Sequence, residues 1–446
     1  MTTYTAKRLP VQTGPAAWNA ILGPQPASEA LSGSNTADFV IIGGGFAGLS
    51  AARRLRQLHS DAVIMVLEAG RVADGAAGRN SGFMIDLPHD LASEDYSGAG
   101  DDRTLITLNR QAIAFARTAV DEYGIDANFF DESGKVNGAA STTAHAHNLS
   151  YAEHLTTLGE HSEKLDAQAM QELTGSAHYL SGLYTPGTVT LQPAGYIRGL
   201  CTGLRKDGVH VFENSPVSAF KKEGATWKVS ISAGTVSTPR VLLANNGHLE
   251  SFGIKSGRLM QLFLFASMTP DLDDTALALL GGQPRWGITP SDPMGTTVRR
   301  IDTAQGGNRI VTRTCAVLKP GMKASQADVD RAARVQQRKF DERFPQLAGL
   351  QMEYKWAGHL CLSLNGVSVM GQIDDGVYSA CVQNGLGTAR GTLTGIAAAE
   401  VASGTQSEIS QFFGAEDAPK KLPPQPFASI GANAYMRWRE WRAAAE

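Results

Sequence analysis

The sequence contains little that would serve covalent cross-linking, metal binding or membrane insertion. Its four cysteines are Cys201, Cys315, Cys361 and Cys381, and none forms a C-x-x-C pair, so neither a disulfide scaffold nor a zinc or other metal site is expected. The longest apolar run, near residues 259–268, is far shorter than the roughly 20 residues that span a bilayer. The first residues lack the apolar core of a signal peptide. These absences predict a cytoplasmic protein.

An excess of basic residues is also missing. The chain of 446 residues has a formal net charge of −3, which argues against a nucleic-acid partner because such proteins normally present a basic face. The length favours two or three structural lobes. The 48 glycines favour tight turns and close approach of the backbone to a ligand. A small-molecule enzyme fits this composition, which leaves the oligomeric state open.

A strand–helix–strand pattern begins at Asp38. Residues 39–42 form a short apolar run that suits a buried parallel strand. Apolar residues then recur at helical spacing from Leu49 to Leu58, and residues 62–67 form a second apolar run. Before this unit, residues 1–34 are rich in Pro, Gly, Ser and Thr and are expected to form an extended arm on the surface.

The turn between the first strand and the helix carries a dinucleotide-binding pattern, Gly43-x-Gly45-x-x-Gly48, with Phe46 and Ala47 inside it. These glycines permit a tight turn, close approach to a pyrophosphate and close helix–strand packing, while the helix N-terminus offers free N–H groups. Glu68, 20 residues after Gly48, ends the second strand and can accept hydrogen bonds from a ribose. An ordinary glycine turn would not explain the flanking strands and helix. The pattern alone does not separate NAD from FAD.

Later segments complete the expected arrangement of elements. Helices are predicted over 103–123 and 324–340, and after the apolar strand 377–382 as far as Val401. A final helix carries Tyr435, Trp438 and Trp441, and this aromatic stripe indicates a docking helix rather than a cofactor box. Further strands are predicted at 209–212, 227–231 and 240–244.

The segment after Glu68 resembles a known family. Glu68-Ala69-Gly70-Arg71, continued by Asp74-Gly75-Ala76-Ala77-Gly78-Arg79-Asn80-Ser81-Gly82, is similar to the second flavin contact of the D-amino-acid-oxidase-like flavoenzymes, and most closely to their γ-glutamylputrescine oxidase branch. The resemblance extends over nearly the whole chain, including Phe344-Pro345-Gln346-Leu347 and the aromatic tail helix.

The resemblance implies that FAD is the cofactor and indicates its contacts. The implied contacts beyond the glycine loop and Glu68 are Ala69, Arg71, Gly78, Arg79, Asn80, Ser81, Gly82, Val217, Gly247, Gly385, Leu386, Gly387 and Thr388. The loop from Asn384 to Arg390 lacks the histidine usual in the family. The register of His359 and Cys361 does not match that of covalently attached relatives, so non-covalent FAD is expected.

The implied fold class is α/β, with a Rossmann-like FAD-binding lobe built on a parallel sheet and an α+β substrate lobe built on an antiparallel sheet. We expect the FAD lobe at 35–95, 166–250 and 346–410. The substrate lobe should occupy 96–165 and 251–345, and a connector and helix should occupy 411–446.

The implied reaction is oxidation of the C–N bond of a small primary or secondary amine or amino acid to an imine, with oxygen as acceptor and hydrogen peroxide as product. Arg299 or Arg300 is the candidate anchor for a substrate carboxylate. No catalytic residue is predicted, because the cofactor performs the difficult step. Two alternatives stay open. One is a dehydrogenase that acts on an amino or hydroxy acid and uses a quinone or carrier. The other, suggested by the altered loop, is a flavin-bound sensor with little turnover.

Overall fold

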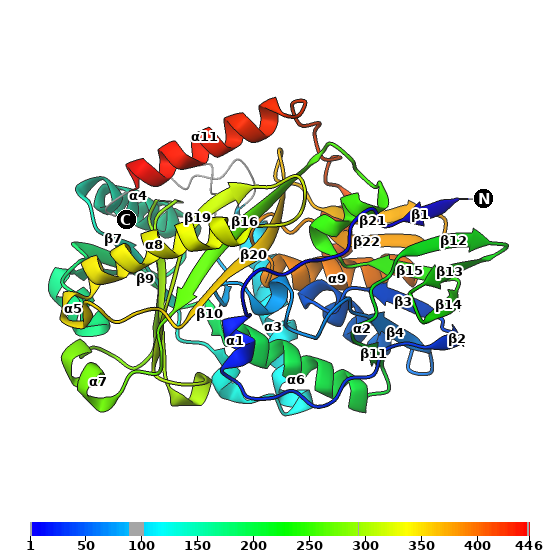
Figure 1. Cartoon of the computed structure of the whole chain (residues 1–446), viewed down its shortest axis with the longest axis horizontal. Coiled ribbons are helices and arrows are strands. Elements are labelled where there is room, and N and C mark those ends of the chain that lie inside the picture. Colours follow the sequence, from blue (N-terminus) through cyan, green and yellow to red (C-terminus); the bar gives the residue numbers. More distant parts are fainter. Residues whose placement is uncertain (1, 89–101, 293, 444–445) are drawn as a thin grey trace.

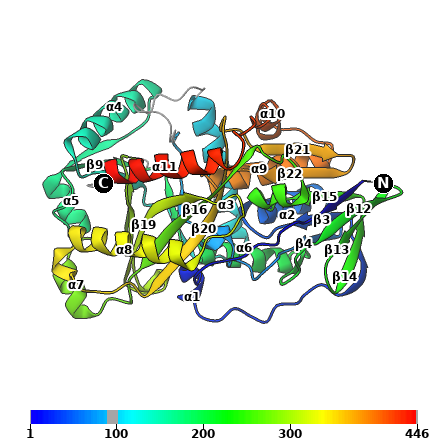
Figure 2. The same cartoon turned by 45° about the horizontal axis from the view of Figure 1, so that its top comes forward.

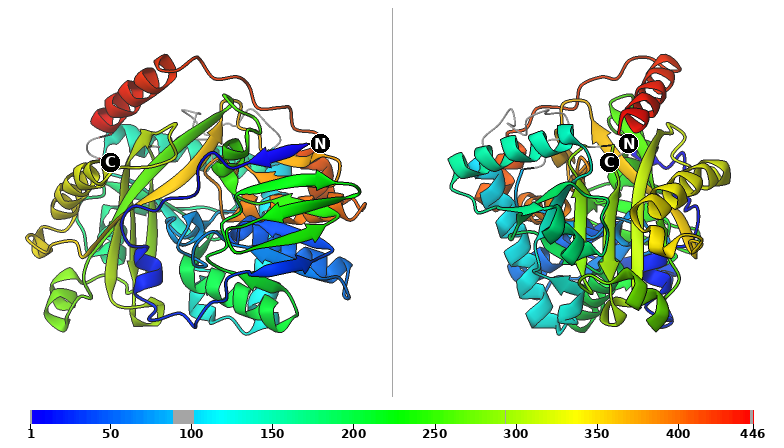
Figure 3. Two further views of the ribbon diagram at one scale, coloured as in Figure 1. Left: turned by 45° about the vertical axis from the view of Figure 1, so that its right-hand side comes forward. Right: turned by 90° about the vertical axis from the view of Figure 1, so that its left-hand side faces the viewer.

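The computed structural model describes residues 2–88, 102–292, 294–443 and 446. Figure 1 shows two blocks side by side: one contains a parallel sheet with helices beneath it, and the other contains a long, mostly antiparallel sheet. The two blocks keep this arrangement when the molecule is turned in Figures 2 and 3. The molecule is therefore the mixed α/β structure that the sequence predicts.

The first block is built on a six-stranded sheet in which every neighbouring pair of strands is parallel except the last. In spatial order its strands are β11 (His210–Phe212), β4 (Ile64–Leu67), β3 (Phe39–Ile42), β15 (Arg240–Leu243), β22 (Val377–Cys381) and β21 (Val369–Asp374). Alternate residues of β3 pack in opposite directions: Phe39 and Ile41 contact the helical layer, whereas Val40 and Ile42 contact the opposite layer. Burial on both faces explains why β3 is continuously apolar.

A smaller antiparallel sheet supplies that opposite layer. Its strands are β1 (Thr3–Thr5), β12 (Ala219–Glu223), β13 (Thr226–Ser230), β14 (Gly234–Thr238) and β2 (Gly33–Thr36), of which only β2 pairs in parallel. Phe220 and Trp227 are fully buried beneath it against the parallel sheet. The helical layer on the other face consists of α2 (Phe46–Leu58), α3 (Asp102–Tyr123), α6 (Pro193–Lys206) and α9 (Ala389–Ala402).

The second block is an eight-stranded sheet. In order its strands are β20 (Tyr354–Ser363), β16 (Leu259–Met268), β19 (Arg309–Leu318), β18 (Thr297–Ile301), β17 (Trp286–Pro290), β7 (Lys135–Ala139), β9 (Ser181–Thr185) and β8 (Glu163–Asp166). Strands β9 and β20 fall within segments expected for the FAD lobe, yet they hydrogen-bond into this sheet. The chain therefore passes between the two blocks more often than the expected boundaries imply. A three-stranded sheet, β5 (Phe83–Met84), β10 (Val189–Leu191) and β6 (Phe130–Asp131), completes the strands.

The remaining helices are α1 (Ala17–Ala20), α4 (Thr142–Leu158), α5 (Ala167–Thr174), α7 (Asp274–Leu280), α8 (Gln326–Arg343), α10 (Glu408–Gly414) and α11 (Phe427–Arg442). Most of them lie around the second block, where α8 packs on β16 and β19 and α11 packs on β19. Helix α10 instead packs on α9 and β21 of the first block, and α1 lies between α6 and β20. The predicted helices at 103–123 and 324–340 correspond to α3 and α8. Among the described residues, no helix combines the length and the apolar character needed to cross a membrane.

The N-terminal arm does not simply lie on the surface, as the sequence predicted. In Figure 1 it leaves β1 beside the first block, reaches α1 between the blocks and returns to β2. Trp18 in α1 is fully buried and donates to the Asn80 carbonyl at 2.9 Å. Burial of this indole and of Leu31, which is 1% exposed, accounts for the difference, because the polar and glycine-rich residues around them gave no sign of a buried segment.

Candidate active site

A continuous cavity lies where the two blocks meet. One end is formed by the loop after β3 and the end of β4, and the other end by the face of the eight-stranded sheet. Residues 6, 8–10 and 12 of the N-terminal arm also line it. The cavity therefore joins a dinucleotide-type loop to a chamber roofed by strands, which is the usual place for a small-molecule site.

Each of the three loop glycines suits its position for a different structural reason. Gly43 has φ = +112°, a conformation that side chains rarely adopt. A Cβ on Gly48 would lie 1.8 Å from the Gly43 carbonyl oxygen, so only glycine lets α2 pack this close to β3. A Cβ on Gly45 would meet only Ala77, at 3.6 Å, and this residue borders the cavity. No side chain caps α2, so its first N–H groups are left for a ligand.

Glu68 lies beside this loop. Its carboxylate accepts hydrogen bonds from the backbone N–H groups of Gly44 at 2.7 Å and Gly70 at 3.1 Å. Burial raises the pKa of this carboxyl, while the backbone donors act in the opposite direction. Two oxygens held in this way keep lone pairs directed at the cavity, as a ribose contact requires.

The turn from Arg79 to Gly82 lines the cavity, but the Arg79 side chain has a different task from the expected one. Its guanidinium donates to four backbone carbonyls, those of Thr13, Gly14, Asp74 and Ala357. Burial lowers the pKa of Arg79 to about 10. Arg79 therefore ties the arm and β20 to the turn, and it also lines the cavity.

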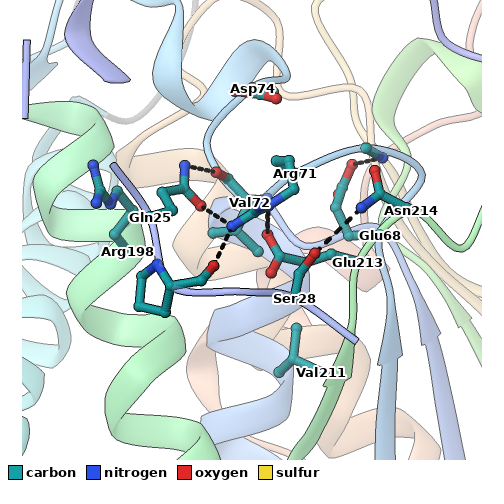
Figure 4. A network of polar contacts seen from close by, with 12 residues as sticks. Gln25, Ser28, Glu68, Arg71, Val72, Asp74, Arg198, Val211, Glu213 and Asn214 are labelled. Carbon is teal, nitrogen blue, oxygen red and sulfur yellow. Dashed lines mark hydrogen bonds and ion pairs between the residues drawn. The ribbon is translucent and has the colours of Figure 1, made fainter. Parts of the chain in front are cut away.

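Arg71 also has a structural partner instead of a ligand. Figure 4 shows its guanidinium between Glu213 and the arm, where it donates to the Glu213 carboxylate at 3.1 Å and to the Pro26 carbonyl at 2.6 Å. Arg71 does not line the cavity. The arginine of this motif is therefore placed away from the cofactor contacts that the resemblance implied.

The loop before α9 closes another wall. Gln383, Asn384, Gly385, Leu386, Gly387 and Thr388 all line the cavity. Asn384 holds the loop, because its side chain accepts from Ser363 N at 2.8 Å and donates to the Val367 carbonyl at 2.9 Å. No side chain caps α9. The altered loop thus retains an ordered backbone and an open helix N-terminus.

The other implied cofactor residues divide into two groups. Ala69, Asn80, Ser81, Gly82 and Val217 line the cavity, as do Phe46 and Ala47. Gly78 and Gly247 do not: a Cβ there would lie 1.9 Å from the Ala73 carbonyl oxygen and 2.3 Å from Gln261 Oε1, respectively. These two glycines serve close packing behind the wall.

The roof of the cavity carries an arginine that the sequence did not single out. Arg313 on β19 pairs across the sheet with Ala266 on β16 and Thr297 on β18, so the three side chains share one face, and all three line the cavity. Arg313 has no hydrogen bond or ion pair with any described residue, and burial alone lowers its pKa. A desolvated guanidinium without an acceptor is a binding site for an anionic group.

The two arginines expected in this role are engaged elsewhere. Arg299 is 2% exposed, donates to the carbonyls of Leu191 at 2.5 Å and Ser81 at 3.1 Å, and packs on the rings of Trp18 and Phe83. Arg300 donates to the Gly281 carbonyl. Neither lines the cavity, so the anchor predicted at Arg299 or Arg300 is not supported. Arg299 instead joins the large sheet to the turn at Gly82.

Two imidazoles lie in the same wall. His248 and His359 pack edge to face with ring centroids 5.3 Å apart, and both line the cavity. Nε2 of His359 is 2.9 Å from Gln261 Oε1. Burial lowers the pKa of His248 to about 4 and that of His359 to about 3. Both rings are therefore neutral at physiological pH. Strand spacing gives no local signal for this pair, because the two residues are 111 positions apart in the sequence.

The residues present fit FAD. The open N-termini of α2 and α9 suit an anionic group and a polar ring edge, and Glu68 suits a ribose. The cavity continues beyond this end to the sheet, as a flavin facing a substrate would need. Glu68 is the only carboxylate among the described residues that line it.

Comparison with known proteins also indicates an FAD-binding protein. Residues 38–401 match the family described as FAD dependent oxidoreductase. The chain is 25% identical over 410 residues to the probable oxidoreductase OrdL of Rhizobium meliloti (strain 1021), with 90% of this chain and 91% of that protein covered. It is also 25% identical over 420 residues to the gamma-glutamylputrescine oxidoreductase of Escherichia coli (strain K12), with 91% and 94% covered.

Solved structures share the fold. Glycine oxidase from Geobacillus kaustophilus aligns with a TM-score of 0.68 at 16% identity, covering 84% of this chain and 96% of that one. Iminodiacetate oxidase from Chelativorans sp. BNC1 aligns with a TM-score of 0.63 at 14% identity, covering 83% and 96%. The family match spans most of the sequence, and the cavity has the donors that the cofactor requires. This chain belongs to the FAD-dependent oxidoreductases of the D-amino-acid-oxidase-like type.

Proposed function

We propose that the protein oxidises the C–N bond of a small amine or amino acid that carries a carboxylate. The observation that carries this proposal is Arg313, an arginine in the roof of the cavity with no acceptor among the described residues. The names of related proteins point the same way, since they include a gamma-glutamylputrescine oxidoreductase and a dimethylglycine dehydrogenase. Bound FAD supplies the two-electron oxidation that converts the amine to an imine, which water then hydrolyses.

The chain's own residues bind and orient the substrate. Arg313 can hold a carboxylate with two parallel hydrogen bonds, which fixes the direction of the rest of the molecule. Thr297 and Ala266 flank Arg313 with small side chains and leave room for the substrate. No described carboxylate lines this end of the cavity, so nothing there stabilises a protonated amine. This environment favours the neutral amine, the form that can be oxidised.

The cofactor contacts remain part of the proposal. We assign the pyrophosphate to the Gly43–Gly48 loop, the ribose to Glu68, the adenine to the backbone at Val217, and the flavin ring to the walls at 80–82 and 385–388. FAD should be held without a covalent bond. Burial raises the pKa of the Cys361 thiol well above its usual value, which disfavours the reactive thiolate. The cysteines are all free and buried, in keeping with a reducing cytoplasmic compartment.

An anaerobic titration tests the proposal. Flavin-loaded protein is mixed with matched amines that have or lack a carboxylate, and the loss of flavin absorbance is followed. Replacing Arg313 with Lys should lower kcat/KM for the carboxylated amine roughly ten- to hundredfold, because Lys lacks the planar fork. The flavin content should not change. Arg309→Lys is the matched control, since Arg309 lies on the same strand and pairs with Glu353 outside the cavity.

Three outcomes would change the assignment. Equal oxidation of amines without a carboxylate, unaffected by Arg313→Lys, would overturn the role of Arg313. Reduction by hydroxy acids and not by amines would replace the substrate class. No reduction by any compound in the panel would favour the sensor alternative. Oxygen is the proposed acceptor, and substrate-dependent formation of hydrogen peroxide tests it. Flavin reduction without peroxide would identify a dehydrogenase.

A further inference from the structure

The C-terminal helix α11 presents its most apolar face to solvent. Its outward side chains are Phe427 (74% exposed), Ile430 (65%), Tyr435 (56%), Trp438 (46%) and Trp441 (74%). At 100° per residue all five fall on one side of the helix, opposite Met436, which is buried. Surface helices normally bury this kind of stripe. The sequence correctly indicated a docking helix, but the aromatic stripe is not the face that docks on this chain.

The inward face of α11 is firmly held, so the exposed stripe does not result from a detached helix. Asn433 Oδ1 accepts from the backbone N–H of Leu318 at 2.8 Å, and Glu440 Oε1 accepts from that of Ala316 at 3.0 Å. Glu440 also pairs with Arg331 of α8. These contacts fix the rotation of α11 about its own axis. In Figure 1 the helix lies along the outside of the molecule, where nothing described covers its outer side.

The stripe has a basic border. Arg437 and Arg442 are exposed on α11, and Lys420 and Lys421 are exposed on the connector that leads to it. The only acidic residue of α11 is Glu440, whose carboxylate is occupied by the contacts just described and by Arg437 at 3.2 Å. The outer face therefore combines aromatic side chains with the positive charges of Arg442, Lys420 and Lys421, while Arg437 shares Glu440 with Arg331.

We propose that this face binds the surface of an anionic lipid membrane, with α11 lying parallel to it. Tyr and Trp favour the level of the lipid headgroups, and a helix with Lys or Arg beside an aromatic face is the arrangement found in interfacial helices. A second copy of the chain fits less well, because its α11 would bring Arg437 and Arg442 toward the same residues and offer no exposed carboxylate on the helix. The charge thus selects a negatively charged surface.

Membrane contact here would also bring lipid close to the catalytic cavity. The apolar cluster beneath α11 contains Met436 and the flanking residues Leu264 and Leu360. Leu264 and Leu360 also line the cavity. The helix that carries the docking face therefore packs, through Met436 on its opposite side, on an apolar cluster that also forms part of the cavity wall.

The experiment measures sedimentation of the flavin-loaded protein with lipid vesicles. Vesicles of phosphatidylglycerol and phosphatidylcholine should bind the protein at low salt, and vesicles of phosphatidylcholine alone should bind it much less. The double variant Arg437→Gln/Arg442→Gln should weaken binding by roughly fivefold for each charge removed. The double variant Trp438→Ser/Trp441→Ser should weaken it at least as much. These side chains are exposed, so folding should survive, and retained flavin absorbance checks this.

Two control variants match the test. Lys164→Gln/Lys228→Gln removes two exposed positive charges from β8 and β13, and Leu279→Ser removes an apolar side chain that is 58% exposed on α7. Both should bind vesicles like the unchanged protein. If the two α11 variants bind anionic vesicles as strongly as the unchanged protein does, the proposal is overturned. Absence of binding of the unchanged protein to anionic vesicles would also overturn it. Self-association abolished by Trp438→Ser/Trp441→Ser, without vesicle binding, would overturn it in favour of a second copy.

Discussion

The two ends of the cavity recognise their ligands by different means. At the loop end, contacts are offered by the backbone of residues 43–48, with Glu68 beside it. At the sheet end, single side chains on separate strands, Arg313, Thr297 and His359, form the wall. Backbone recognition needs a continuous stretch with glycines at fixed places, whereas side-chain recognition needs only that distant residues meet. The first leaves a motif in the sequence and the second does not.

The largest expected effect is a loss of folding stability at acidic pH, caused by the two imidazoles at the sheet end of the cavity. Because folding depresses the pKa values of His248 and His359, the unfolded chain binds more protons than the folded protein once the pH falls below about 6.5. Stability is therefore full above that pH and is lost as the pH falls toward about 4. Between pH 7 and pH 5 the free energy of unfolding should drop by about 2 kcal/mol for each imidazole.

Urea unfolding of the flavin-loaded protein at both pH values measures this loss. The double variant His248→Gln/His359→Gln should be less sensitive to acid by about 4 kcal/mol. His210→Gln, an exposed position on β11, is the control. The same sensitivity to acid in the double variant and the control would mean that other groups dominate.

Adding one methyl group at Gly48 should disrupt the loop end of the cavity. In Gly48→Ala the new Cβ would collide with the Gly43 carbonyl oxygen 1.8 Å away, so α2 must shift from β3. We expect a loss of about 3 kcal/mol in stability and no retained flavin after dialysis. Gly431→Ala, where no atom lies within 4 Å, serves as the control. Normal flavin content in Gly48→Ala would show that close packing at this point is unnecessary.

Glu68 tests the side-chain contribution at the same end. Glu68→Ala removes the proposed ribose acceptor and should weaken FAD binding ten- to hundredfold, since a hydrogen bond to a charged group contributes about 1.5–3 kcal/mol. Equilibrium dialysis measures the change. Glu29→Ala, an exposed carboxylate on the nearby arm, should bind FAD normally. If Glu68→Ala retains FAD equally well, the ribose is bound by other groups.

The smallest expected effect concerns the N-terminal arm that covers both ends. Ser251 Oγ accepts from the Arg8 N–H at 2.8 Å and donates to the Arg8 carbonyl at 2.5 Å. Ser251→Ala should loosen the arm by about 1 kcal/mol and increase the rate of flavin release roughly fivefold. Ser256→Ala, which removes an exposed hydroxyl bonded only to Gly253, is the control. An unchanged release rate would mean that the arm does not limit exit.

The sequence predicted the elements that neighbouring residues form, and it did not predict contacts between residues that are far apart in the chain. The β3–α2–β4 unit follows from apolar runs and three glycines within 30 residues. Arg71 and Arg79 were expected at the cofactor, yet apart from the Asp74 carbonyl their acceptors lie in the arm, in Glu213 and in β20, which are distant in sequence. A flexible guanidinium within a motif does not reveal which carbonyls it will reach.

The same limit explains why the sequence did not identify Arg313, the proposed carboxylate anchor in the roof of the cavity. Arg299 and Arg313 both lie on strands of the large sheet, and both are desolvated. What separates them is the neighbour each meets: Arg299 reaches the carbonyls near Gly82, while Arg313 faces open space. Periodicity gives the face of a strand, but the register between strands decides what lies opposite, and register is set by the whole sheet.

The course of the arm also dictates an order of assembly. Residues 3–18 are synthesised before all of their partners, which include Asn80, Ser251, Ala324 and Ala357. The arm must therefore wait, undocked, while the loop and Glu68 already exist. Docking of the arm on these partners is therefore a late event in folding, although its residues 6, 8–10 and 12 form part of the cavity wall.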